Sequence, residues 1–183
     1  MGASHQKRLF LLRHAIALND MADGDKGRAL APKGKEDAIA LGKLMKHKSL
    51  TPDIILCSSA RRTQETMNGV QDALQVENVQ NIDILYSGST GDYLHEIQKI
   101  DDANDSILMI AHNPSIYELV RLLGAQGTDS VMQRLTEGYQ PATLSVIHCA
   151  CEKWADIQPV ENELVLITDP MDYNAPARPT RWM

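Results

Sequence analysis

Three short apolar segments constrain the fold of this chain more than any other feature of its sequence. They are 9–12 (Leu-Phe-Leu-Leu), 53–57 (Asp-Ile-Ile-Leu-Cys) and 106–111 (Ser-Ile-Leu-Met-Ile-Ala). Continuous apolar runs of this length are typical of strands that are buried on both faces, as in a parallel sheet. The sequence therefore predicts an α/β fold with a mostly parallel central sheet.

Polar residues follow each of these segments directly. They are Arg13 and His14 after the first segment, Ser58 and Arg62 after the second, and His112 and Asn113 after the third. In open α/β sheets, ligand sites lie outside the carboxyl ends of the strands, so we expect these side chains to meet at one edge. Arginine, histidine and serine side chains gathered there would bind an anion.

Helical spacing and capping residues predict the other elements. Pro32 begins a helix that runs to about Lys48, and Ala31 before it is a poor cap. A second helix has Arg62 in its first turn. We also expect helices over 92–100 and from Pro114 to Leu123, and strands over 82–85, 143–151, 154–158 and 164–168, with 143–151 and 154–158 forming a hairpin. The segment 125–140 receives no assignment.

A length of 183 residues favours one domain, and we expect it to span 1–183 with irregular tails at 1–7 and 171–183. The segment 15–30 is predicted to be a long loop beside the anion site. Long loops are often functional, so Arg28 is a candidate substrate contact, with a solvated arginine as the equally weighted alternative.

Composition excludes several classes of function. The net charge of −6 argues against nucleic acids and anionic membranes as partners. No apolar run approaches the ~20 residues of a membrane helix and no signal peptide is present, so we expect a cytoplasmic protein. Cys57 lies in a predicted buried strand, and Cys149 and Cys151 lack further ligands at zinc spacing. Core packing is therefore expected for these cysteines, rather than disulfides or a metal.

Three motifs together resemble the histidine phosphatase superfamily, and within it the small SixA-like branch of phosphohistidine phosphatases. They are Leu12-Arg13-His14-Ala15, Ser58-x-x-x-Arg62-x-x-x-Thr66 and Ala111-His112-Asn113-Pro114. The segments 28–34, 59–63, 154–156 and 168–170 also look like that branch, so the resemblance covers nearly the whole chain. It implies a phosphoglycerate mutase-like fold, a three-layer sandwich in which helices flank the sheet.

The resemblance also implies roles for individual residues. His14 would be the nucleophile that becomes phosphorylated, while Arg13, Arg62 and His112 would bind the phosphoryl oxygens. Such fixed donors suit phosphoryl transfer, in which charge spreads over the equatorial oxygens. We expect the neighbouring arginines to lower the pKa of His14 below the ~6.5 of a free histidine. No metal and no cofactor are expected.

Further residues near these motifs are weaker candidates. Ser58 and Asn113 are candidate substrate contacts, together with Arg28. Capping of the second helix is an equally weighted alternative for Ser58 and the favoured interpretation for Thr66. The remaining histidines match nothing in the family pattern and are expected to be structural or solvent-facing: His5, His47, His95 and His148.

Two departures from the family pattern bear on the activity. Ala15 replaces the glycine that follows the histidine in the broader signature, as expected for the SixA-like branch. Asn19 lies one position short of the asparagine of the mutases, which disfavours mutase activity.

Three functions stay open: a phosphatase for phosphohistidine on a protein such as a histidine phosphotransfer domain, a phosphatase for small phosphoesters, and a phospho-ligand binding module without turnover. Phosphoester cleavage needs a general acid, yet no glutamate lies between Glu77 and Glu96. Asp92 fits a helix capping box better than it fits an acid. An imidazole can leave as a neutral molecule, so phosphohistidine is the favoured substrate.

Overall fold

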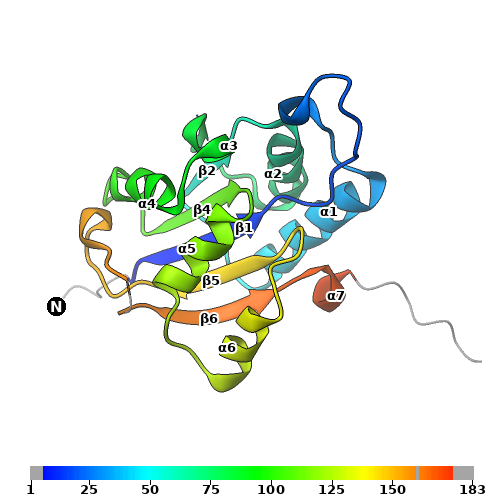
Figure 1. The fold of residues 1–183 in the computed structure, drawn as a ribbon. Helices are drawn as coiled ribbons and strands as arrows, with labels where there is room; N and C mark the ends of the chain where they lie inside the picture. The colour runs from blue at the N-terminus through cyan, green and yellow to red at the C-terminus, as the bar shows by residue number, and fades with distance from the viewer. Residues whose placement is uncertain (1–5, 160, 175–183) are drawn as a thin grey trace, which may run out of the picture.

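The computed structural model, which describes residues 6–159 and 161–174, has a six-stranded sheet between two layers of helices (Figure 1). The strands are β1 (Arg8–Arg13), β2 (Ile54–Ser58), β3 (Val79–Ile82), β4 (Ser106–Ala111), β5 (Leu144–His148) and β6 (Glu163–Thr168), in the order β3-β2-β4-β1-β5-β6. The first four strands in that order are parallel, and β5 is antiparallel to both of its neighbours. The predicted three-layer, mostly parallel architecture is confirmed.

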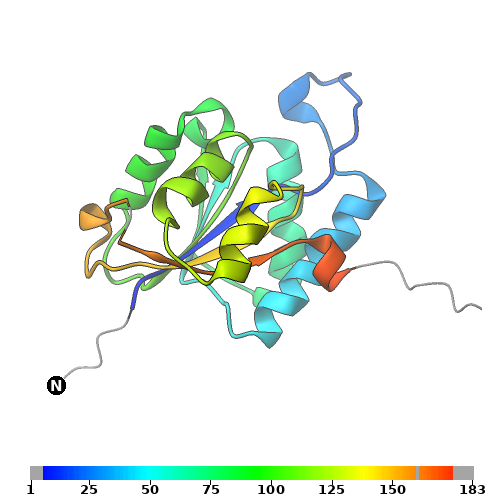
Figure 2. The same ribbon diagram turned by 60° about the horizontal axis from the view of Figure 1, so that its bottom comes forward.

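Helices cover both faces of the sheet. One layer holds α1 (Pro32–His47), α2 (Arg61–Leu74) and α7 (Pro170–Tyr173); the other holds α3 (Ile84–Ser87), α4 (Thr90–Gln98), α5 (Ser115–Leu123) and α6 (Asp129–Thr136). Two 3-10 turns, η1 (Asp25–Gly27) and η2 (Trp154–Asp156), complete the described elements. The second view shows the same layering, with η1 standing beyond the sheet (Figure 2).

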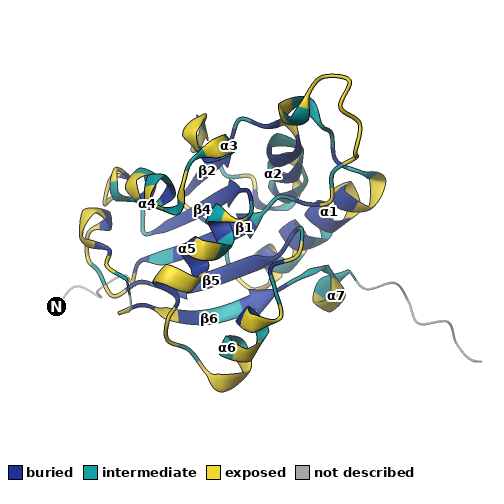
Figure 3. Ribbon diagram, viewed as in Figure 1, coloured by how far each residue is buried: buried dark blue, intermediate teal, exposed yellow. Residues whose placement is uncertain are grey.

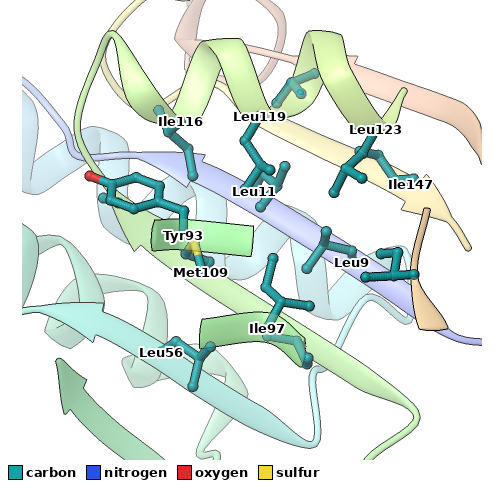
Figure 4. Packing of buried hydrophobic residues seen from close by; sticks show 14 of the residues in the cluster. Leu9, Leu11, Leu56, Tyr93, Ile97, Met109, Ile116, Leu119, Leu123 and Ile147 are labelled. Atoms are coloured by element: carbon teal, nitrogen blue, oxygen red, sulfur yellow. The ribbon is translucent and has the colours of Figure 1, made fainter. Parts of the chain in front are cut away.

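Alternate residues of each central strand enter different cores, which explains why the strands are apolar throughout. Leu9 and Leu11 of β1 pack with α4 and α5, as Figure 4 shows, whereas Phe10 and Leu12 pack with α1 and α2. All four side chains are fully buried. Figure 3 shows the consequence: the central strands β1, β2 and β4 are largely buried, and exposed residues lie mainly on the outer faces of the helices and in the loops.

Two predicted strands are wrong. The segment 82–85 is not a strand, because Ile82 ends β3 and α3 begins at Ile84; Leu85 reaches the core from that helical turn. β3 is an edge strand with exposed Gln80 and Asn81, so it lacks the apolar run that marks a buried strand.

The segment 154–158 is also not a strand, and the predicted hairpin with 143–151 does not exist. β5 ends at His148 and pairs with β1 and β6. Trp154 begins the turn η2, where its indole N–H donates to the carbonyl of Asn104. This side-chain hydrogen bond of Trp154, and not backbone pairing with 143–151, holds the segment in place.

The helix caps agree with the sequence. The start of α1 has no side-chain cap, and Ser89 with Asp92 forms the predicted capping box of α4. The unassigned segment 125–140 contains α6, and the 15–30 loop contains η1 and a bridge between Ala17 and Leu30.

The expected tails are only partly described. Lys7 is buried and donates to the carbonyl of Asp102, so it is held against the protein and is not part of a loose tail. Residues 171–173 belong to α7, so the predicted irregular tail is wrong there. Residues 1–5 of the expected N-terminal tail, which include His5, and the expected tail beyond residue 174 lie outside the described residues.

Cys57 and Cys149 are buried and Cys151 is partly buried, as core packing predicts, and all three cysteines are free. Within the described ranges, no helix is both long and apolar enough to cross a membrane.

Candidate active site

The register of the sheet brings His14, Ser58 and His112 together. β1 and β4 are parallel with Arg13 opposite Ala111, so the two histidines leave their strands at the same level. Their ring centroids lie 5.1 Å apart, with the planes inclined by 58°. Ser58 ends β2, is fully buried, and places its Oγ 2.8 Å from Nε2 of His112. The carboxyl edge of the sheet thus carries all three side chains.

Arg62 reaches the same place from the first turn of α2. Its Nε donates to Nε2 of His14 at 3.3 Å. Its terminal nitrogens bind Asp25: Nη1 donates to the backbone oxygen at 2.7 Å and Nη2 donates to the carboxylate Oδ2 at 3.1 Å. Asp25 begins η1, which both ribbon views place at the end of α2 (Figures 1 and 2).

Arg13 and Asn113 are held by one backbone carbonyl. Nη1 of Arg13 donates to the oxygen of Tyr139 at 2.6 Å, and Nδ2 of Asn113 donates to the same oxygen at 3.1 Å. Nε of Arg13 and Oδ1 of Asn113 are buried and have no hydrogen-bond partner within 6–159 and 161–174. The buried Nε–H of Arg13 is therefore left without an acceptor in the described part of the chain.

The contacts of His14 assign its tautomer. Nδ1 lies 2.7 Å from the carbonyl oxygen of Ala15, which only accepts hydrogen bonds, so Nδ1 carries the hydrogen. Nε2 then holds the lone pair that Arg62 faces. Burial, and then the charges of Arg62, Arg13 and Arg28, lower the pKa of His14 to about 4. The predicted direction is confirmed, although burial and not the arginines is the larger cause.

His112 is oriented in a complementary way. Oγ of Ser58 accepts from the backbone N–H of Ala60 at 3.4 Å, and within the described residues Nε2 of His112 is the only acceptor in contact with it, so the buried Ser58 hydroxyl donates to that nitrogen. Nδ1 then carries the hydrogen, and it is buried without a partner in the described part of the chain. Burial, followed by the proximity of His14 and Arg62, lowers the pKa of His112 to about 3. His112 is thus a neutral donor.

Arg28 lies beside the site but is engaged within its own loop. Its Nη1 donates to Oδ1 of Asp25 at 3.1 Å, its Nε to the carbonyl of Leu18 and its Nη2 to the side chain of Asn19. Its role as a substrate contact stays a prediction.

Thr66 ties two parts of the site together. Its Oγ1 accepts from the backbone N–H of Ala15 at 3.0 Å and donates to the carbonyl of Arg62 at 2.7 Å. This contact agrees with the packing role that we expected. Of the other histidines, His47 and His95 are exposed and His148 is partly buried.

Sequence reasoning missed two residues that contact the site. Asp25 carried no signal beyond its place in a long loop. Tyr86 lies in α3, next to the segment mistaken for a strand, and its hydroxyl donates to Oδ2 of Asp25 at 3.0 Å. Its ring meets that of His112 edge-on at 5.8 Å, and the guanidinium of Arg62 lies 5.9 Å from its centre.

The arrangement suits an anion rather than a metal. Nε of Arg62 donates to the neutral imidazole of His14, the charge of Arg13 also acts on it, and the ring of His112 lies 5.1 Å away. No three His, Cys, Asp or Glu side chains within the described ranges gather closely enough to hold a metal ion. An unprotonated imidazole nitrogen beside fixed cationic donors is an arrangement that suits phosphoryl transfer.

Comparisons with known sequences show what this chain is similar to. The family model described as histidine phosphatase superfamily (branch 1) matches residues 9–93, a range that includes His14 and Arg62 but not His112. An uncharacterised protein of Mycobacterium tuberculosis is 28% identical over 152 residues, which cover 81% of this chain and 92% of that protein.

Solved structures give the same result at the level of the fold. A protein of Nakamurella multipartitia assigned as the phosphohistidine phosphatase SixA superposes with a TM-score of 0.77 at 27% identity, covering 90% of this chain and 96% of the other. A protein of Agrobacterium tumefaciens with the same assignment gives 0.75 at 25% identity, covering 90% and 99%.

Proposed function

This chain belongs to the histidine phosphatase superfamily, in its SixA-like branch, and on that premise we propose that it is a phosphatase that works through a phosphoenzyme on His14. The proposed substrate is phosphohistidine on a protein, such as a histidine phosphotransfer domain. The proposed place of action is the cytoplasm. The resemblance read from the sequence, and the phosphoglycerate mutase-like fold it implied, are confirmed.

One observation carries the proposal: Nδ1 of His14 is hydrogen-bonded to the carbonyl of Ala15, while the unprotonated Nε2 accepts a hydrogen bond of 3.3 Å from Nε of Arg62. A histidine nucleophile must be neutral and must present its unprotonated nitrogen to the phosphorus. The low pKa of His14, about 4, keeps it neutral at physiological pH.

In the first step, the Nε2 lone pair of His14 attacks the substrate phosphorus. The N–P bond of the substrate breaks as the new N–P bond forms, and the electron pair goes to the leaving imidazole. If that imidazole carries a hydrogen on its other nitrogen, it departs as a neutral molecule, as His14 was before the attack. The exchange is symmetric in charge, so no proton has to move.

In the second step, water attacks the phosphoryl group on His14. The electron pair returns to Nε2, and both hydrogens of the water leave with inorganic phosphate. In both steps the N–H groups of Arg13, Arg62 and His112 would bind the equatorial oxygens, over which negative charge spreads. Nδ1 of His14 keeps its hydrogen bond to Ala15 throughout.

The ionised states of Asp92 and Asp25 support phosphohistidine over phosphoesters as the substrate. The N–H and hydroxyl of Ser89 both donate to Asp92 at 2.7 Å and hold the pKa of that carboxyl below its usual range. Hydrogen bonds, first from Arg28 and then from Tyr86, lower the pKa of Asp25 to about 2. Both carboxyls are ionised at neutral pH and neither can protonate an alkoxide, which leaves poorly without a general acid.

A substrate panel tests the proposal. Phosphate release would be measured from a phosphotransfer domain carrying phosphohistidine, a phosphoserine peptide and a sugar phosphate. We expect kcat/KM for phosphohistidine to exceed the other values by at least about 100-fold, the rate that a general acid would contribute to ester cleavage.

His14→Ala should release no phosphate, while the matched control His95→Ala, in an exposed position of α4, should match the unmodified protein. Equal turnover of phosphoserine or sugar phosphate would favour the small-phosphoester activity. Tight binding of phosphohistidine without release would favour a binding module.

A further inference from the structure

Asp25 receives three side chains from different parts of the chain. Its Oδ2 accepts from Nη2 of Arg62 at 3.1 Å and from the hydroxyl of Tyr86 at 3.0 Å, and its Oδ1 accepts from Nη1 of Arg28 at 3.1 Å. Its backbone oxygen accepts Nη1 of Arg62 at 2.7 Å. Two charge-assisted bonds and a tyrosine hydroxyl therefore fix this carboxylate.

Asp25 binds one edge of the Arg62 guanidinium and leaves another edge to the nucleophile. Both terminal nitrogens of Arg62 donate to Asp25, whereas Nε donates to Nε2 of His14. His14 is still partly exposed in this arrangement. Asp25 thus holds the far end of the guanidinium without covering the nucleophile.

The segment that carries Asp25 is itself fastened on two sides. Lys26 forms an ion pair with Asp83 at 3.0 Å and lies 5.5 Å from the ring centre of Tyr86, so η1 is attached to the segment around α3. Gly24 before it has φ +71°, a backbone conformation that other residues rarely adopt. The contact between Asp25 and Arg62 therefore joins two anchored elements, η1 and α2.

We propose that Asp25 is a positioning residue for phosphoryl transfer: it fixes the guanidinium of Arg62 so that the Nε edge faces His14, and the Tyr86 hydroxyl orients its carboxylate. This inference rests on the proposed function, because Arg62 is taken to bind the transferred phosphoryl group. An arginine held at its far edge needs no reorganisation as charge develops, and small displacements of such a group are costly in rate.

Vanadate and inorganic phosphate are the probes that test this role. Vanadate becomes five-coordinate like the transition state, whereas phosphate resembles the product, so their dissociation constants separate transition-state from ground-state binding. Both dissociation constants would be measured by calorimetry on the unmodified full chain and on three single variants, Asp25→Asn, Tyr86→Phe and Arg62→Lys. The double variant that combines Asp25→Asn with Arg62→Lys would be measured in the same way. Asp23→Asn, which removes the same charge from an exposed position of the loop, is the matched control.

We expect Asp25→Asn to weaken vanadate binding about ten-fold, with a smaller change for phosphate and a parallel fall in kcat. Tyr86→Phe keeps the ring and removes the hydroxyl, so it should weaken vanadate binding in the same direction but less. In the Arg62→Lys background the effect of Asp25→Asn should vanish, because lysine has no second edge to hold. Asp23→Asn should change neither affinity.

Two results would overturn the inference. Tighter binding of both anions by Asp25→Asn would show that the carboxylate competes with the phosphoryl group for Arg62. An equal loss in the unmodified and the Arg62→Lys backgrounds, accompanied by a lower Tm, would show that Asp25 only stabilises the loop. If the unmodified protein turns over no phosphorylated substrate, the proposed function fails. The vanadate affinities of the two single variants and the double variant would still test whether Asp25 acts through Arg62.

Discussion

His14 and His112 lie 5.1 Å apart between ring centroids, and each has one ring nitrogen bound to an oxygen: Nδ1 of His14 to the carbonyl of Ala15, and Nε2 of His112 to Ser58. The remaining nitrogens of the two rings therefore differ: Nε2 of His14 carries a lone pair, and Nδ1 of His112 carries a hydrogen. Under the proposed function, His14 would act as the nucleophile and His112 as a hydrogen-bond donor, and protonation of either ring would disrupt that arrangement.

The first prediction concerns pH. The pKa of His14 is about 4 and that of His112 about 3, both below the 6.5 of a free histidine. As the pH falls below about 4, the lone pair of His14 is lost and phosphoenzyme formation should fall. Between pH 6.5 and 4 the unfolded chain binds more protons than the folded chain, so the free energy of unfolding should also decrease as the pH falls.

Histidine ring signals in an NMR titration measure this directly, with His14→Ala and His112→Gln used for assignment. Because the two rings are neighbours, the titration midpoints are apparent pKa values of the coupled pair and not of either histidine alone. Midpoints at 6.5 or above would contradict the assigned neutral pair.

The second prediction concerns the support of His112. Ser58→Ala removes the hydroxyl that binds Nε2 of His112 and leaves that nitrogen buried without a partner. We expect a loss of about 1–3 kcal/mol of stability, the usual cost of such a group, and a lower kcat because the ring can turn. Ser59→Ala, whose hydroxyl instead bonds Asp83, is the matched control and should keep kcat unchanged. Equal kcat values for the two variants would show that Ser58 does not support His112 in the reaction.

The third prediction is a phosphoenzyme on His14. Rapid quench with labelled substrate should give an acid-labile, base-stable adduct, because a phosphorus–nitrogen bond to imidazole hydrolyses in acid. The His14→Ala protein should form no adduct, while His148→Ala, which lies opposite Arg8 at the other end of β1 from the site, should form it normally. An adduct on another residue would refute the assignment of the nucleophile.

The central architecture was predictable because burial on both faces leaves a simple sequence pattern. β1, β2 and β4 are continuous apolar runs, and polar residues at their carboxyl ends had to share one edge. β3 escaped detection because an edge strand with Gln80 and Asn81 exposed has no such pattern. Asp25 escaped for a different reason: its partner Arg62 is 37 residues away, and a contact between a loop and a helix leaves no periodic pattern.

The fourth prediction is independence from metal ions. In many phosphatases a metal ion stabilises the negative charge on the phosphoryl oxygens. Here the N–H groups of two arginines and a histidine would stabilise that charge instead. We expect full activity after exhaustive chelation and dialysis, measured as phosphate release at saturating substrate. Activity that depends strictly on added Mg²⁺ or Zn²⁺ would show that the site lacks a component that the side chains do not supply.

The last prediction concerns the leaving group and separates the two phosphatase activities. Asp92 closes the capping box of α4 by accepting the N–H and hydroxyl of Ser89, and these bonds keep its carboxyl ionised. Asp92→Asn should therefore leave kcat for phosphohistidine within about two-fold, whereas loss of a true general acid costs about 10²–10⁴-fold. Stability should fall by no more than about 1 kcal/mol, since asparagine still offers a capping oxygen. If Asp92→Asn instead abolishes turnover of an alkyl phosphate that the unmodified protein cleaves as well as phosphohistidine, Asp92 is the acid and the protein acts on small phosphoesters.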